Sequence, residues 1–191
     1  QMAALPLHPR LSHMIIGATP LGLTGLACEV AALLSERDIL QGSREDQNPD
    51  LRVRLDLLHG QRDSIGPPVH RATIERVRRT AQLWHRQLSA PSVKENTDRH
   101  DRSQAIGMLL ALAYPDRIAQ RQTGEEARYR LVNGRGAQFT GPNPLAAESF
   151  LVVADLDGST PWARIHLAAP ITREEITSLY RDQLVVEEAV T

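Results

Sequence analysis

The stretch Leu109 to Arg121, LLALAYPDRIAQR, contains the point at which the sequence changes character. Apolar residues up to Ala113 recur with the spacing of a helix face, whereas those beyond it alternate with polar ones. Pro115 lacks a backbone N–H, so the pattern predicts that a helix ends there. We expect Ile118 to be an inward anchor between two packing units, with arginines on both sides of it.

The part of the chain before Pro115 has the patterns of helices. Polar segments separate these patterns, and residues 89–101 are expected to form a linker or a long surface loop. Apolar residues at the spacing of one helix face predict helices at 11–18, 23–34, around 51–58, 74–88 and 103–113.

The part after Pro115 has the patterns of short strands. Residues 128–132 alternate and end at Asn133-Gly134, a hairpin signal. Thr172 and Glu175 have the spacing of a capping box, which predicts a short helix at 172–180. We further expect a buried strand at 150–154, a turn at 157–159, a partner strand at 162–168 and a last strand at 184–186.

Helices followed by short strands with tight turns indicate an α+β fold. The sequence therefore predicts a helical bundle at residues 1–101 that ends in the polar linker. A small β-barrel at 102–191, entered by a helix, should follow, because such strands fit a barrel or sandwich better than a parallel sheet.

Composition suits a soluble globular protein, since 41% of the 191 residues are hydrophobic and 24% are charged. No apolar run approaches the ~20 residues that span a bilayer, so no membrane association is expected. One cysteine, Cys28, predicts a reduced, cytoplasmic chain in which this thiol is a small buried hydrophobe. The chain begins with Gln rather than Met, and we interpret it as a piece of a longer protein.

Arginine carries almost all of the positive charge, since the chain has 21 arginines and one lysine. The formal net charge is −1. The guanidinium fork suits phosphate and bases, although a GC-rich genome is the simpler explanation of the overall bias. The charge is uneven along the chain. Residues 71–86 carry +4, residues 116–135 carry +2 and residues 145–191 carry −5.

Two arginine clusters are the candidate nucleic-acid-binding residues. They flank the predicted linker, so they could line a shared basic groove, with counterion release contributing to binding. A solvated polar face is the ordinary explanation of either cluster, and both interpretations stay open. The candidates are Arg71, Arg79 and Arg86, opposite the apolar stripe of their helix, and Arg117, Arg121, Arg128, Arg130 and Arg135.

The sequence offers no catalytic or metal-binding motif. The only lysine, Lys94, follows a valine, so there is no phosphate-binding P-loop, and no Gly-x-Ser-x-Gly elbow occurs. Seven histidines show no paired spacing with acids that would favour a metal. The polar segment Thr97–Asp101 gathers acids around a histidine, but within a loop. We expect no catalytic residue, no metal site and no cofactor in this chain.

Several segments, in order, resemble the C-terminal accessory region of DEAH-type RNA helicases, most closely the bacterial HrpB helicases. LPLHPRLSHM at 5–14 is similar to the start of the family's helical ratchet domain, and AALLSERD at 31–38 to the end of its next helix. LLALAYPDRIAQR at 109–121 resembles the passage into an OB-like domain. YRLVNGRG at 129–136 and LVVADLDG at 151–158 resemble strands of that domain.

The resemblance implies a ratchet-like bundle and an OB-like barrel that close one side of a channel around single-stranded RNA, with DNA left open. The partners would be that strand and the motor domains of the same polypeptide, which use ATP and Mg and whose motifs do not occur here. Aromatic residues are only 4% of the chain, so arginine–phosphate contacts are expected to dominate over base stacking. The alternative is a protein-interaction module that docks a regulator through the OB-like domain and its acidic segment. A self-contained enzyme is the third hypothesis.

Overall fold

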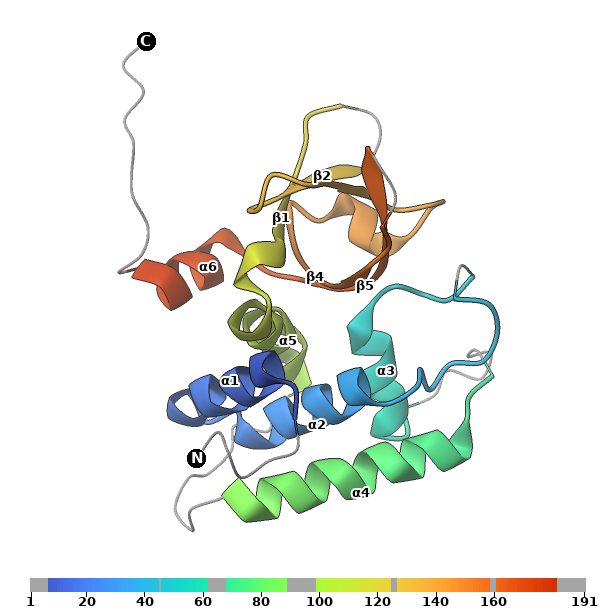
Figure 1. Cartoon of the computed structure of the whole chain (residues 1–191), viewed down its shortest axis with the longest axis vertical. Helices are drawn as coiled ribbons and strands as arrows, with labels where there is room; N and C mark the ends of the chain where they lie inside the picture. The colour runs from blue at the N-terminus through green and yellow to red at the C-terminus, as the bar shows by residue number, and fades with distance from the viewer. Residues whose placement is uncertain are drawn as a thin grey trace.

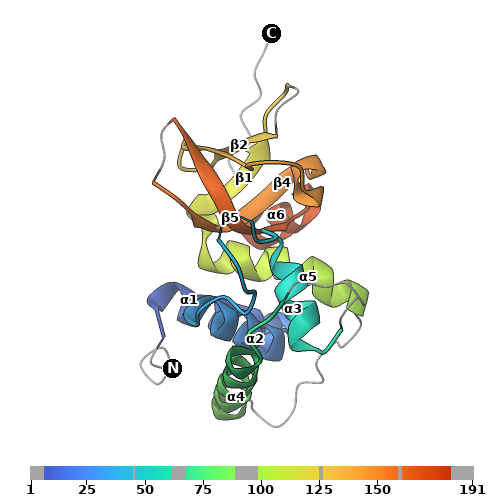
Figure 2. The same ribbon diagram turned by 90° about the vertical axis from the view of Figure 1, so that its right-hand side faces the viewer.

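The structure is a computed structural model that describes residues 7–44, 46–61, 68–88, 99–124, 127–158 and 161–181. Helices form one half of the molecule and a β-barrel forms the other (Figure 1). The barrel lies at one end and the long helix α4 at the other, in two views related by 90° (Figures 1 and 2). Most of the other helices lie between them.

Helices occur where the apolar spacing predicts them. Pro9 opens the first helix, where its missing N–H is not needed, and the His8 ring accepts a hydrogen bond from the Arg10 N–H. Asp50 caps the third by accepting from the Arg52 N–H. The helices are α1 (Pro9–Ala18), the 3-10 helix η2 (Thr19–Leu21), α2 (Thr24–Ser35), α3 (Leu51–Leu58), α4 (Arg71–Leu88) and α5 (Arg99–Ala113).

Helix α5 begins earlier than the sequence indicates. The loop expected at 89–101 is wrong in its last three residues, because α5 starts at Arg99, while 89–98 lie outside the described residues. Polar residues at 99–101 carry no apolar spacing, so the pattern could not reveal them as helix. The expected domain boundary at 101/102 falls inside α5, and the exact division of the chain into two domains stays a prediction.

Five strands close into a barrel in the order β1-β2-β3-β5-β4. All pairs are antiparallel except β3 with β5, which are parallel. A small five-stranded barrel of this kind is OB-like, which confirms the predicted α+β class. The elements after α5 are η3 (Pro115–Arg117), β1 (Ile118–Arg121), β2 (Arg128–Leu131), β3 (Gly136–Gln138), η4 (Pro144–Ala147), β4 (Phe150–Leu156), β5 (Trp162–Pro170) and α6 (Arg173–Tyr180).

Two local sequence patterns in the barrel half, a capping box and a hairpin turn, are confirmed by the structure. The Thr172 hydroxyl accepts from the Glu175 N–H and the Glu175 carboxylate accepts from the Thr172 N–H, which confirms the capping box of α6. Gly134 has φ of +84° in the β2–β3 turn, as the hairpin requires. Strand β1 was not expected, because four residues give too short an alternation. The last strand predicted at 184–186 lies outside the described residues.

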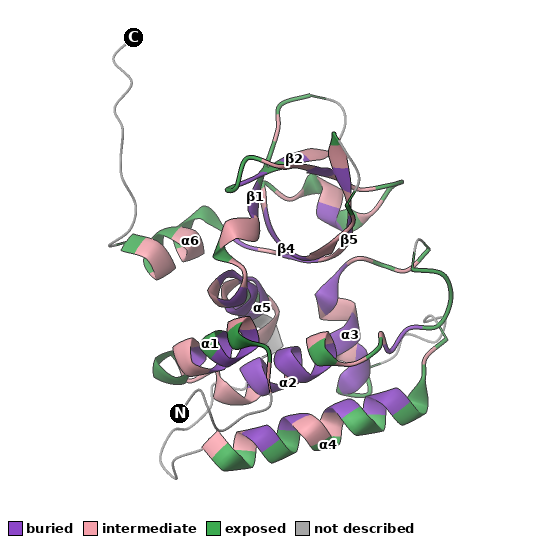
Figure 3. Cartoon of the chain, in the orientation of Figure 1, coloured by how far each residue is buried: buried purple, intermediate pink, exposed green. Residues whose placement is uncertain are grey.

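Two hydrophobic cores share the strand β4. Leu151 and Val153 point into the barrel, whereas Val152 and Ala154 belong to the core of the helices. This explains why the sequence of β4 is continuously apolar, since both of its faces are buried (Figure 3). Ile118 also packs with the helical core, which confirms it as the anchor between the two halves.

The segment between α2 and α3, which we call the strap, joins the helices to the barrel. The carbonyl of Pro49 accepts a hydrogen bond from the Ala168 N–H of β5 at 2.9 Å. The guanidinium of Arg54, 3% exposed, pairs with Asp38 at 2.7 Å and donates to the carbonyl of Asn48. Arg54 therefore holds both ends of the strap from inside.

Cys28 is fully buried in α2, as the sequence predicts. Among the described helices, none has both the length and the apolar character needed to cross a membrane.

Gly107 marks the closest approach of α5 to the barrel. A Cβ atom at this position would lie 2.0 Å from the Pro170 carbonyl oxygen and 3.1 Å from the Ile171 Cβ atom. Both neighbours are fixed by backbone, so no side-chain rotation can relieve the overlap. Only glycine allows the helix to lie this close to the end of β5.

We predict that Gly107→Ala lowers the free energy of unfolding by about 2 kcal/mol, because the overlap outweighs a gain of about 1 kcal/mol in helix propensity. Gly17→Ala in α1 is the matched control, since its Cβ atom would meet only the flexible side chain of Leu112, at 3.2 Å. Urea denaturation followed by circular dichroism measures both. Equal effects of the two substitutions would contradict the packing argument.

Candidate nucleic-acid interface

The outer surface of β2, β3 and β5 gathers basic side chains around a tryptophan. Inward residues of these strands, such as Tyr129, fill the barrel, so the alternate residues face outward. Register places Arg130, Gly136 and Trp162 in one row across the three strands, and Arg128, Gln138 and Arg164 in the next. We call Arg128, Arg130, Gln138, Trp162 and Arg164 the β2–β3–β5 face.

Trp162 packs closely against Gly136 on this face. A Cβ atom on Gly136 would come within 2.5 Å of the indole ring, so any larger residue would displace the tryptophan. The guanidinium of Arg128 lies 4.9 Å from the Trp162 ring centre, within the range of a cation–π contact. Arg128 and Trp162, from strands that do not pair with each other, are thereby held together across β3.

Three arginines and no acid make up the charged part of the β2–β3–β5 face. Arg130 is exposed, and Arg128 and Arg164 are half-buried. The nearby Asp157 accepts the backbone N–H of Arg164 at 2.9 Å and pairs with His166 at 3.8 Å. This carboxylate is thus engaged at the edge of the face. The face can offer guanidinium groups to phosphates and an aromatic ring to a base.

Two of the predicted arginines are tied to the backbone of the chain. Arg117 donates to the Ala154 carbonyl at 2.8 Å, and Arg135 donates to the Asp157 carbonyl at 2.8 Å. Both are half-buried; Arg117 lies in η3, between α5 and β1, and Arg135 lies in the turn between β2 and β3. Their guanidinium groups contribute first to holding the barrel together.

The arginines of the junction surround Tyr114. The guanidinium of Arg117 lies 4.9 Å from its ring centre and that of Arg10, from α1, lies 5.5 Å away. Burial raises the pKa of Tyr114 above its ordinary value of 10, with Arg117 and Arg10 acting in the opposite direction, so the phenol stays neutral. Arg10 also forms an ion pair of 2.5 Å with Asp116, and this hydrogen bond lowers the pKa of the carboxyl group.

Arg121 lies at the mouth of the barrel rather than on the β2–β3–β5 face. It is the register partner of Tyr129, whose hydroxyl hydrogen-bonds to the carbonyls of Leu145 and Glu148 at 2.8 and 2.9 Å. Burial raises the pKa of Tyr129 to about 12, with Arg121 acting against that rise. Arg121 is exposed and can contact a ligand that crosses this end of the barrel.

Arg71, Arg79 and Arg86 are exposed on α4. Their neighbours Arg76 and Arg78 instead form ion pairs with Glu36 and Glu75. Helix α4 and the barrel stand at opposite ends of the molecule (Figures 1 and 2). The two arginine clusters therefore do not line one shared groove, contrary to that sequence-based hypothesis. Helix α5 lies between α4 and the barrel (Figure 1), an arrangement that no charge pattern in the sequence indicates.

The sequence-based candidates did not include Arg164, and no sequence pattern favoured Trp162 among the aromatic residues. The alternation of Trp162, Arg164 and His166 with buried residues on β5 does indicate an outward row. The parallel pairing of β5 with β3 that brings this row beside Arg128 and Arg130 has no local sequence signal.

In the described part of the chain, no three His, Cys, Asp or Glu side chains converge as a metal site requires. The candidate interface therefore consists of arginines and one aromatic ring on the β2–β3–β5 face.

Comparisons with known proteins agree with this architecture. The ATP-dependent RNA helicase HrpB of Escherichia coli is 30% identical to the chain over 178 residues, which are 92% of the chain and 18% of that helicase. A crystal structure of the E. coli DExH-box NTPase HrpB matches 95% of the chain, and 19% of its own length, at 30% identity and a TM-score of 0.67. A structure of the E. coli DEAH/RHA helicase HrpB shares the fold, at 23% identity and a TM-score of 0.64 over 91% of the chain. No family model matches the chain.

Fold and comparisons together define the chain as an accessory region of a helicase. Within that class it belongs to the HrpB-type helicases, and it spans less than a fifth of the length of these relatives.

The ion pair of Arg10 and Asp116 predicts an acid-sensitive contribution to stability. Because the folded state lowers the pKa of Asp116, the contribution is present above the ordinary value of 3.8 and is lost as the pH falls through the folded value. Both side chains are about 40% exposed, so we expect Asp116→Asn to cost less than about 1 kcal/mol at pH 7. The difference from the unsubstituted chain should vanish toward pH 2.

Urea denaturation at several pH values measures the contribution of the Arg10–Asp116 ion pair to stability. Asp46→Asn removes an exposed carboxylate for which the described structure shows no ion pair, and should change stability by less than about 0.5 kcal/mol. A cost for Asp116→Asn that does not change with pH would show that the ion pair is not its source.

Proposed function

We propose that this chain holds single-stranded RNA beside the motor domains of a helicase, along the β2–β3–β5 face of its barrel. The observation that carries the proposal is the convergence of Arg128, Arg130 and Arg164 around Trp162 on one side of an OB-like barrel. Oligonucleotides bind OB-folds across the face of strands 2 and 3. The basic face of this barrel occupies those strands.

The chemistry of the face favours contacts that do not depend on sequence. Guanidinium groups bind phosphate oxygens in pairs, and a tryptophan can stack on any base. With one tryptophan on the face, electrostatic contacts should supply most of the affinity. The name of the E. coli relative, an ATP-dependent RNA helicase, supports RNA as the ligand.

Motor domains that use ATP and Mg would belong to the parent protein, as in an ATP-dependent relative. The chain itself would have no ATPase activity, since its sequence has no P-loop lysine motif. The strand would be held here while the motor moves it.

A regulator-docking module, the second hypothesis, has less support. It relied on the acidic balance of residues 145–191, but several of these acids already have partners in the chain. Asp155 forms an ion pair with Arg44, Asp157 pairs with His166, and Glu175 completes the cap of α6.

We predict that Arg130→Gln with Arg164→Gln weakens binding of a labelled single-stranded RNA about tenfold or more at low salt, because each charge-assisted contact contributes about 1.5–3 kcal/mol in part-buried settings and less when exposed. The loss should be similar for unrelated sequences. The slope of log K against log salt should shrink by about 0.7 for each phosphate contact removed. Fluorescence anisotropy measures both quantities.

The triple substitution Arg71→Gln, Arg79→Gln and Arg86→Gln on α4 is the matched control. It removes more positive charge from the opposite end of the molecule and should leave the affinity within about twofold, as screening limits the effect of distant charges. If the α4 variant loses binding and the barrel variant does not, the strand lies on α4 and the proposed face is wrong.

Trp162→Leu separates stacking from charge. It keeps an apolar residue over Gly136 but removes the flat ring, and should weaken RNA binding by about 1–3 kcal/mol without changing the salt slope. Circular dichroism confirms that the barrel stays folded. An unchanged affinity would show that the indole serves only to position Arg128.

A further inference from the structure

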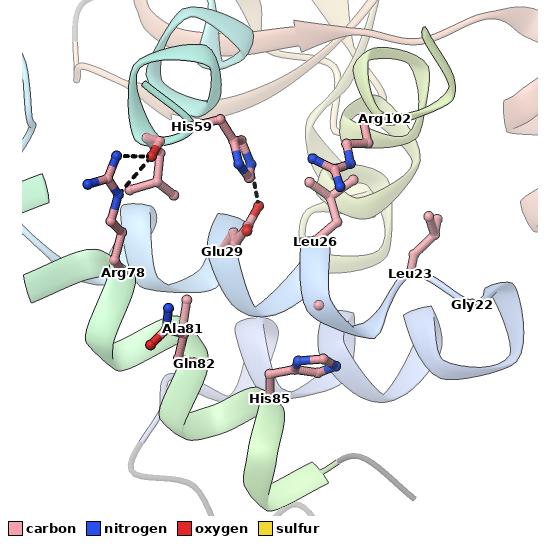
Figure 4. A pocket seen from close by; sticks show the side chains of 12 residues that line it. Gly22, Leu23, Leu26, Glu29, His59, Arg78, Ala81, Gln82, His85 and Arg102 are labelled. Atoms are coloured by element: carbon pink, nitrogen blue, oxygen red, sulfur yellow. Dashed lines mark hydrogen bonds and ion pairs between the residues drawn. The ribbon is translucent and has the colours of Figure 1, made fainter. Parts of the chain in front are cut away.

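A polar pocket in the helical half lies apart from the β2–β3–β5 face. It has a volume of about 240 Å³ and is lined by the start of α2, the end of α3, the middle of α4 and the start of α5 (Figure 4). This volume is below the ~300–1,000 Å³ of sites for drug-sized ligands, so the pocket suits a small charged group.

Basic side chains reach this pocket from three helices. Arg102 comes from α5, His85 and Arg78 from α4, and His59 follows the end of α3. Figure 4 shows Arg102 directed toward the same space as His59 and Glu29. No carboxylate of the described residues pairs with Arg102.

The other charges at the pocket are already engaged. Glu29 is the one acid among the described lining residues, and its carboxylate lies 3.0 Å from the His59 ring nitrogen. Arg78 donates to the Leu58 carbonyl at 2.8 and 2.5 Å and pairs with Glu75 at 2.7 Å. Among the described lining residues, Arg102 is therefore the cation for which no ion pair is found, and the amide of Gln82 can donate a further hydrogen bond.

The walls of the pocket strengthen such an interaction. Leu23, Leu26, Leu58 and Ala81 form its apolar surface, and charges interact more strongly beside a surface of low dielectric than in water. A guanidinium group matches the oxygens of a phosphate bidentately, whereas a metal ion would find no suitable ligand cluster among the described residues.

We propose that this pocket binds a phosphate monoester group, held by the guanidinium group of Arg102 and a hydrogen bond from the amide of Gln82. The group can belong to a small phosphorylated molecule such as a nucleotide or to the 5′ end of a strand. This site is separate from the proposed strand-holding face, and neither depends on the other.

Isothermal titration calorimetry of the chain with inorganic phosphate, AMP and adenosine at low ionic strength tests the proposal. Phosphate and AMP should bind and adenosine should not. Arg102→Gln should weaken binding of phosphate and of AMP about tenfold or more, since it removes the charge that pairs with the phosphate. Gln82→Glu, on the exposed side of α4, adds a repelling charge and should have the same effect.

Two control variants keep this outcome distinct from RNA binding on the barrel. Arg79→Gln, on the outside of α4, and the pair Arg130→Gln with Arg164→Gln should both retain phosphate binding. Comparison of a 5′-phosphorylated with a 5′-hydroxyl dinucleotide identifies the source, because a preference for the phosphorylated end that is lost in Arg102→Gln assigns the site to strand ends. If AMP binds as tightly as that dinucleotide, the site takes small molecules.

Either of two results would overturn the proposal. One is the absence of phosphate binding by the unsubstituted chain. The other is unchanged binding in both Arg102→Gln and Gln82→Glu, which would place the phosphate elsewhere. Thermal unfolding of each variant checks that a lost signal does not come from a lost fold.

Discussion

The close contact between Gly107 of α5 and the Pro170 carbonyl positions the barrel on the helices. Because the backbone of α5 lies directly against the end of β5, the outward residues of β4 can complete the core of the helical half. Ile118 and the strap that ends at Asp50 close the same interface from two other directions. The orientation of the β2–β3–β5 face relative to the helices follows from these backbone contacts.

Arginines in this protein divide into structural and solvent-facing groups according to what surrounds them. Arg54, Arg117 and Arg135 bind backbone carbonyls, where a guanidinium satisfies several acceptors at once. Arg130 is exposed on the β2–β3–β5 face, and among the described residues no hydrogen bond or ion pair of its guanidinium group is found. A residue type that is abundant in the sequence therefore has several unrelated roles, and composition alone cannot assign them.

Membership in the HrpB-type helicases gives the two proposed binding sites a common context. An accessory region that holds a strand needs no catalytic residues of its own. The motor domains would supply the energy for movement, and the accessory region would bind the strand as it moves. The paucity of aromatic rings is consistent with this role, since a strand that must slide benefits from phosphate contacts that are equivalent at every step. A phosphate pocket in the helical half would add a site that binds one phosphate group, whereas the β2–β3–β5 face would contact a strand along its length.

Local patterns in the sequence determined most of the secondary structure and the point at which helices give way to strands. Periodicity, Pro115, the Asn133-Gly134 turn and the Thr172 cap act between neighbouring residues, so they can be read without a structure. Only the tertiary structure decided that the two arginine clusters face opposite ends, and that Arg164 and Trp162 join Arg128. Those relations depend on the pairing of β3 with β5 and on packing through α5, which join residues far apart in the chain.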